Sequence, residues 1–172
     1  IELGLVGSEM CIRDRTTPFI LPILTDYGYV ETAYKMIENT KQPSWLYNVS
    51  KGATTIWENW HGVNEEGVPH DSFNHYAFGA VTQWFYSRVA GIQPLAPGFE
   101  RVLIKPVPGG SFTWINCTYK SAHGPIVSNW RIENGTFSLE VEVPVEAEVE
   151  LPNGETHTID AGKHQFTSEL PD

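Results

Sequence analysis

The hydrophobic period of this chain changes once, and that change constrains its fold more than any other feature. Up to about Gly91, apolar residues recur every three or four positions, as on one face of an α-helix. After Pro97 they alternate with polar residues, as in half-buried strands. The sequence therefore predicts a few helices followed by a small all-β domain, joined near residues 92–97.

Two stretches carry the helical period. In residues 26–40, Asp26 can serve as the N-cap, and the apolar face comprises Tyr27, Val30, Ala33, Tyr34 and Ile37. In residues 71–94, Asp71 or Ser72 can cap a second helix that Gly91 and Pro94 end. Its apolar face comprises Phe73, Tyr76, Ala77, Ala80, Val81, Trp84, Phe85 and Val89. Gly79 inside this helix costs about 1 kcal/mol relative to Ala, which indicates close approach of another backbone or of a ligand.

The second half of the chain predicts seven or eight short strands. Phe137, Leu139, Val141 and Val143 alternate with polar residues, and Asn134-Gly135 and Asn153-Gly154 are typical hairpin turns. The other candidate strands are residues 101–107, 112–120, 126–132, 146–151, 156–160 and 164–168. This spacing favours an antiparallel β-sandwich. The acidic outward positions favour a solvated surface over a cation site; they are Glu140, Glu142, Glu146, Glu148 and Glu150.

Composition excludes several classes of function. The net charge of -10, from 21 acidic and 11 basic residues, argues against a nucleic-acid partner, which requires a basic face. No apolar run is long enough to cross a membrane. The two cysteines, Cys11 and Cys117, lie far apart and give neither a disulfide framework nor metal-ligand spacing. The compartment stays open between cytoplasmic, periplasmic and secreted.

Residues 1–15 have no helical or strand period and differ in character from the rest of the chain. Their segment LVGSEMCIRDR resembles the translation of a sequencing-library adaptor, although an ordinary irregular N-terminus is the alternative. We therefore expect three segments: non-native residues 1–15, residues 16–94 as the C-terminal part of a larger helical domain, and residues 95–172 as the β-sandwich. The remainder of the helical domain is expected upstream of about Thr16, because so few helices cannot bury their aromatic residues unaided.

A long connection, residues 42–70, carries the candidate chemistry. Within this connection, Glu58 lies between Trp57 and Trp60. His75 follows the connection and is expected in the first turn of the next helix, where backbone N–H groups are unpaired and the helix dipole is positive. Aromatic faces that pack on sugar C–H groups, beside a carboxylate and an imidazole that bind hydroxyls, suit carbohydrate hydrolysis. The plainer alternatives are a loop Glu making a surface hydrogen bond, a His bonding a neighbouring loop, and two core tryptophans.

Three motifs occur in order: Pro43-Ser44-Trp45, GATTIWENW at residues 52–60, and SFNHYAFGA at residues 72–80. Together they resemble the C-terminal part of bacterial α-L-rhamnosidases, glycoside hydrolase family 78, from about Thr16 onward. The resemblance implies the last helices of an (α/α)₆ barrel followed by a C-terminal β-sandwich. It also implies hydrolysis of terminal α-L-rhamnosyl groups with inversion, with no cofactor and no metal.

The resemblance also assigns roles to residues. Glu58 matches the general base of the family, and His75 matches a residue that contacts rhamnose; Trp57 and Trp60 are implied to bind or support the sugar. No stretch of this chain matches the segment that carries the general acid, so the chain alone is expected to be inactive and to fold poorly. Two alternatives stay open: a fragment of an (α/α)₆ glycosidase with another specificity, and a non-catalytic carbohydrate-binding or structural sandwich. The aglycone, the linkage preference and the oligomeric state also stay open.

Overall fold

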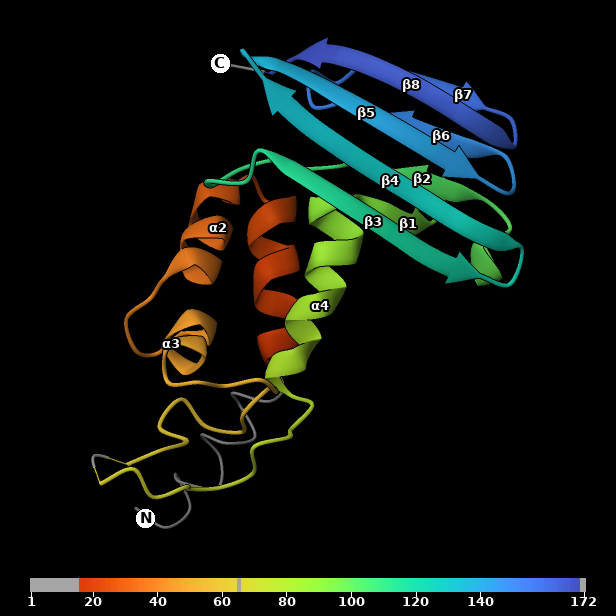
Figure 1. Cartoon of the computed structure of the whole chain (residues 1–172). Coiled ribbons are helices and arrows are strands. Elements are labelled where there is room, and N and C mark those ends of the chain that lie inside the picture. Colours follow the sequence, from red (N-terminus) through yellow and green to blue (C-terminus); the bar gives the residue numbers. More distant parts are fainter. Residues whose placement is uncertain (1–15, 65, 171–172) are drawn as a thin grey trace. The chain divides into compact units, whose positions relative to one another are not determined.

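The computed structural model describes residues 16–64 and 66–170. It divides into two compact units, Ile1–Trp84 and Phe85–Asp172, of which the first is helical and the second is built of strands (Figure 1). The adaptor-like residues 1–15 lie outside the described part. The order of helices followed by strand-rich sheets is confirmed.

Within its described residues, the helical unit contains five short helices. Residues 16–26 are helical, and they are followed by α2 (Val30–Glu38), α3 (Trp45–Ser50), the 3₁₀ turn η1 (Phe78–Ala80) and α4 (Val81–Trp84). The helix of residues 16–26, α2 and α4 run side by side (Figure 1). No helix in the described residues is long and apolar enough to cross a membrane.

Trp84 anchors the core of the helical unit. Its indole meets the ring of Tyr34 edge-on, with centroids 5.0 Å apart. Its Nε1–H donates to Thr25 Oγ1 at 2.8 Å, and that hydroxyl donates to the Leu21 carbonyl at 2.9 Å. Leu21, Tyr34 and Trp84 are almost completely buried, so three helices meet at this one indole.

The first expected helix begins later than its sequence pattern predicts. Asp26 is wrong as an N-cap, because it is the last residue of the preceding helix, while α2 begins after Tyr29. Gly28 at φ +83° separates the two helices and leaves the Tyr27 side chain 78% exposed. The C-terminal part of the pattern is correct, since Ala33, Tyr34 and Ile37 are buried.

The second expected helix begins at Phe78, five or six residues later than a cap at Ser72 or Asp71 would place it. Residues 71–77 are irregular, so Asp71 and Ser72 do not cap a helix and His75 does not lie in a first helical turn. Tyr76, which the pattern assigns to the apolar face, is 81% exposed. The cause is long-range pairing: residues 70–75 donate and accept hydrogen bonds with residues 55–62, and those bonds take the place of the helical ones.

Two smaller expectations about this region need correction. A Cβ added at Gly79 would make only an ordinary 3.7 Å contact with the Ile56 side chain, so no backbone of the described residues approaches this glycine closely; the alternative, a ligand close to Gly79, stays a prediction. The connection from residue 42 to 70 is not wholly irregular, because it contains α3, which Ser44 caps by accepting the Tyr47 N–H at 3.0 Å.

The second unit begins with a π-helical turn, η2 (Phe85–Val89), and contains a 3₁₀ turn, η3 (Pro97–Phe99). One sheet has the order β1-β2-β6-β7, comprising Ile92–Pro94, Val102–Ile104, Ala147–Glu150 and Thr156–Ile159. The other has the order β3-β4-β5-β8, comprising Trp114–Ser121, Gly124–Glu133, Thr136–Val143 and Gly162–Glu169. Figure 1 shows the two sheets stacked face to face.

The expected β-sandwich is confirmed, with eight strands where the sequence indicated seven or eight, and it differs from the expectation in two respects. The pairing of β2 with β6 is parallel, whereas the other neighbouring pairs are antiparallel. Strand β1 was not predicted, because its three residues come directly after the helix. The turn between β4 and β5 has positive φ at both Asn134 and Gly135, as a tight hairpin turn requires.

Trp130 and Ser128 fix the end of the helical turn η2 to the sheet. Trp130 Nε1–H donates to the Val89 carbonyl at 2.8 Å, and Ser128 Oγ donates to the Ala90 carbonyl at 2.6 Å. Gly91 then ends the turn at φ +78°, and a Cβ there would lie 2.2 Å from the backbone of Lys105. Glycine is therefore required at this position for both conformation and space.

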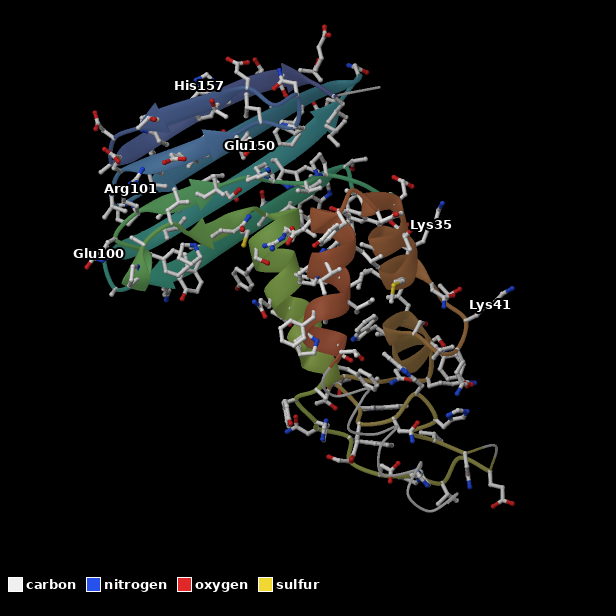
Figure 2. The ribbon with its side chains drawn as sticks, turned by 180° about the vertical axis from the view of Figure 1, so that it is seen from behind. Lys35, Lys41, Glu100, Arg101, Glu150 and His157 are labelled. Atoms are coloured by element: carbon white, nitrogen blue, oxygen red, sulfur yellow. The ribbon has the colours of Figure 1, made fainter. Side chains whose placement is uncertain are left out.

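The acidic positions are solvent-accessible, as expected, and most of them also form ion pairs. Arg101 binds Glu146 at 3.2 Å and Glu148 at 2.6 Å, and Lys105 binds Glu150 at 2.7 Å. Figure 2 labels Glu150, which ends β6, and Arg101, which directly precedes β2.

Cys117 is a free thiol in β3, and partial burial raises the pKa of this thiol.

Candidate active site

Glu58 is positioned by two loop segments that run against each other. His75 N–H donates to the Ile56 carbonyl at 2.9 Å, and His70 N–H donates to the Gly62 carbonyl at 2.8 Å. Between these bonds, Glu58 N–H donates to the Ser72 carbonyl at 2.9 Å. The Thr55 hydroxyl also donates to the Phe73 carbonyl. These contacts bring the GATTIWENW and SFNHYAFGA motifs together.

The two oxygens of the Glu58 carboxylate have different surroundings. Oε2 accepts the Ser72 N–H at 3.1 Å. Oε1 lies 3.9 Å from His75 Nε2, which is too long for a hydrogen bond but close enough for one small group to contact both atoms. The two side chains are 22% and 21% exposed. The carboxylate is thus held through one oxygen and is open to a ligand at the other.

His75 has its tautomer set by a backbone contact. Its Nδ1 accepts the Ala77 N–H at 3.2 Å, so the proton of the neutral ring is assigned to Nε2, the nitrogen that faces Glu58. Its ring also stacks on that of Tyr76, with centroids 5.0 Å apart. Imidazole and carboxylate therefore present a donor and an acceptor side by side.

Asp71 lies next to Ser72 and is itself held by two neighbouring side chains. Its Oδ2 accepts from Asn59 Nδ2 at 3.2 Å and lies 2.7 Å from His70 Nδ1. Asp71 has φ +59°, a left-handed conformation that Asp tolerates better than most residues. Because Ser72 is the next residue, the conformation of Asp71 sets the direction in which the Ser72 N–H points toward Glu58.

Trp57 and Trp60 differ in their burial. Trp57 is 5% exposed and stacks on Phe73 at 4.5 Å, and its ring fills the space where a Cβ at Gly62 would lie. Trp60 is half-buried and stacks on Phe78 at 3.9 Å. This geometry gives Trp57 a supporting position beneath the loop; a substrate contact by either indole stays a prediction.

A groove of about 670 Å³ runs beside the same loops. Its lining includes Tyr47, Lys51, His61 and His70, but it does not include Glu58, His75, Trp57 or Trp60. Across residues 16–64 and 66–170, no three His, Cys, Asp or Glu side chains gather as a metal ion would require. The described residues thus offer a carboxylate–imidazole pair on a partly open surface.

The sequence predicted Glu58 and His75 as site residues, and the structure places these two side chains together. The sequence-based prediction missed the residues that hold them, which are Asn59, Asp71 and Ser72. The reason is that Asp71 and Ser72 were interpreted as helix caps. The available signal was the Asp71-Ser72 pair itself, since Asp and Ser also favour turns in which their side chains bind backbone groups.

Two models of protein families match successive parts of the chain. Residues 14–89 match the bacterial alpha-L-rhamnosidase six-hairpin glycosidase domain, and residues 91–166 match the bacterial alpha-L-rhamnosidase C-terminal domain. This chain belongs to the bacterial α-L-rhamnosidase family. The expected resemblance is thereby confirmed.

Curated relatives agree with this assignment. An α-L-rhamnosidase of Streptomyces avermitilis is 42% identical over 142 residues, which are 79% of this chain and 14% of that protein. An α-L-rhamnosidase of Formosa agariphila is 37% identical over 158 residues, which are 88% of this chain and 17% of that protein. The chain thus spans about a sixth of the length of the relatives that it matches.

Solved structures of rhamnosidases share the fold. The Streptomyces avermitilis α-L-rhamnosidase complexed with L-rhamnose superposes with a TM-score of 0.83 at 35% identity, over 89% of this chain and 17% of that one. The Aspergillus terreus α-L-rhamnosidase gives a TM-score of 0.84 at 33% identity, over 88% of this chain and 18% of that one.

The boundary between the two family models lies near residue 90. It falls between the domain boundary expected at residue 94 and the division of the structure after residue 84.

Proposed function

We propose that this chain carries the general-base side of the active site of an inverting α-L-rhamnosidase. The observation that carries the proposal is the pairing of Glu58 with His75, in which Oε2 of the carboxylate is held by Ser72 N–H while Oε1 stays free 3.9 Å from Nε2. The substrate class is supported by the family and by the Streptomyces avermitilis relative, which was solved with L-rhamnose.

In the proposed reaction, Glu58 Oε1 accepts a proton from a water molecule. The water oxygen forms a bond to the anomeric carbon while the bond from that carbon to the aglycone oxygen breaks. A general acid donates a proton to the leaving oxygen, so the products are free rhamnose and the aglycone alcohol. Glu58 suits the role of base because only one of its oxygens is occupied by a backbone donor.

His75 is proposed to bind a hydroxyl group of the sugar. Its Nε2–H can donate to a hydroxyl oxygen whose own proton is directed at Glu58 Oε1, since both atoms lie within reach of one small group. Trp60, half-buried on Phe78, is proposed to support the sugar at the edge of the site, and Trp57 to hold the loop from beneath.

The general acid is proposed to come from a part of the polypeptide outside this chain. The carboxylate of Asp71, the residue before Ser72, is engaged by the side chains of Asn59 and His70. An inverting enzyme needs two carboxyl groups roughly 6.5–9.5 Å apart with a water between them. We therefore expect the 172-residue chain alone to release no rhamnose.

Hydrolysis of an aryl α-L-rhamnoside tests the proposal. A longer polypeptide that contains this chain and an upstream barrel segment should release L-rhamnose, and proton NMR in the first minutes should show the β-anomer first. Appearance of the α-anomer first would exclude inversion. Rhamnose release by the 172-residue chain alone would contradict the assignment of the acid to another segment.

A further inference from the structure

The sheet β3-β4-β5-β8 presents two rows of side chains on its outward face, which are polar except for Trp114. Strand register aligns Trp114, Arg131, Ser138 and Thr167 in one row. It aligns Asn116, Asn129, Glu140 and Gln165 in the next. The intervening residues of the two central strands, such as Trp130 and Leu139, are buried on the inner face, so both rows point away from the core.

The rows line a hollow of about 350 Å³. This volume is near the lower end of the roughly 300–1,000 Å³ typical of ligand sites, so it suits a short ligand. At one corner, the Trp114 side chain is 56% exposed, although an indole is among the largest apolar surfaces that a strand can present.

Several hydrogen-bonding groups in the hollow are unoccupied. Gln165 Nε2 donates to Glu140 Oε1 at 3.1 Å, and Asn129 Oδ1 accepts the Cys117 N–H at 3.1 Å. These contacts leave the Asn129 amide N–H groups and the Gln165 amide oxygen available. Within the described residues, nothing hydrogen-bonds to the Asn116 side chain. The planar amides thus offer both donors and acceptors.

The charge of this face indicates an uncharged ligand. Within the hollow, Arg131 contributes one guanidinium and Glu140 one carboxylate, and Arg131 is already paired with Glu133 at 3.1 Å. Because the hollow has no excess of either sign, it does not favour a polyanion or a polycation. A ligand that matches an exposed indole and several amides carries apolar C–H groups and neutral hydroxyls on one surface.

We propose that this face binds a short, uncharged oligosaccharide, with a sugar ring stacked on Trp114 and hydroxyls bound by the amides of Asn116, Asn129 and Gln165. The proposed site is non-catalytic. It does not depend on the proposed function, because its residues all belong to the second unit, whereas Glu58 belongs to the first.

Titration of the longer polypeptide that contains this chain, ¹⁵N-labelled within residues 16–172, with neutral oligosaccharides of about three to six sugars tests the proposal. Backbone amides of the two rows and the Trp114 indole N–H should shift, with a Kd on the order of 1 mM or tighter. Trp114→Ala should abolish the shifts and Trp114→Phe should retain part of the affinity. Gln165→Ala should weaken binding, whereas Lys163→Ala, on the same strand and face but outside the hollow, should not.

Three results would overturn the proposal. One is the absence of shifts in both rows while the dispersed amide signals of the sheet show that it is folded. Another is preferential binding of an anionic oligosaccharide such as trigalacturonate. Shifts confined to residues 55–77 would assign sugar binding to the Glu58 region alone and would equally exclude a site on the sheet.

Discussion

Glu58 and Ser72 are joined by two reciprocal hydrogen bonds, one from each backbone N–H. The side chain of Asn59 binds Asp71 in parallel with them, so these four loop positions act as a single clamp on the carboxylate. The sequence predicted Glu58 and His75 from residue type and motif. It could not predict the clamp, because the clamp depends on contacts between residues more than ten positions apart.

Asp71 provides a test of this clamp in the longer polypeptide. Asp71→Ala removes the acceptor for Asn59 and His70 and places alanine, which tolerates left-handed backbone less well than Asp, at φ +59°, so the Ser72 N–H should no longer aim at Glu58. Since small displacements of catalytic groups can cost about 100-fold in rate, kcat should fall between about 10- and 100-fold with little change in KM.

Asp71→Asn is the matched control for that experiment. Asn retains an acceptor oxygen and the tolerance for left-handed backbone, so it should keep most of the kcat of the wild type. Steady-state kinetics on an aryl α-L-rhamnoside measures both variants. Wild-type kcat in Asp71→Ala would show that the clamp has no part in catalysis.

The apolar pattern of the sequence predicted the strands more accurately than the helices. Alternation predicted the long strands β3, β4 and β5 well, because pleating and burial impose a period of two on each strand. The pattern from residue 71 to 90 is equally regular, yet only its second half is helical. In the first half Phe73 packs on Trp57 and His75 binds Ile56, and these long-range contacts override helical propensity.

Tyr34 in α2 predicts a loss of stability in alkali. Burial, and after it the negative charges of Glu38 and Glu31, raise the pKa of Tyr34 far above its ordinary value. The unfolded chain therefore releases this proton above about pH 10 while the folded chain retains it. Each further pH unit should lower the free energy of unfolding by up to about 1.4 kcal/mol, a contribution that is fully present below about pH 10.

Urea unfolding followed by helical circular dichroism between about pH 8 and pH 11.5 measures this effect. Tyr34→Phe should flatten the alkaline loss, because phenylalanine has no proton to release. Tyr29→Phe is the control, since that side chain is 63% exposed and outside the core. An equally steep loss in wild type and Tyr34→Phe would contradict the assignment.

Across the chain, the order of the helical part and the β-sandwich was predictable from the sequence. The pairing of strands within the sandwich was only partly predictable. The change of period separated the helical part from the sandwich, and ordered motifs indicated the rhamnosidase family that the family models then matched. The parallel pairing of β2 with β6 was not predictable, because residues 102–104 and 147–149 are brought together by a connection through the other sheet.

The activation of the attacking water by Glu58 in the longer polypeptide is the step on which the proposed function depends. Its most direct test is the comparison of Glu58→Gln with Glu66→Gln, an exposed residue of the same connection, in both hydrolysis and L-rhamnose binding. Glu58→Gln should lower kcat by about 10²–10⁴-fold while the Kd for L-rhamnose stays close to that of the wild type, and Glu66→Gln should change neither. A Glu58→Gln enzyme that keeps most of its kcat would contradict the claim.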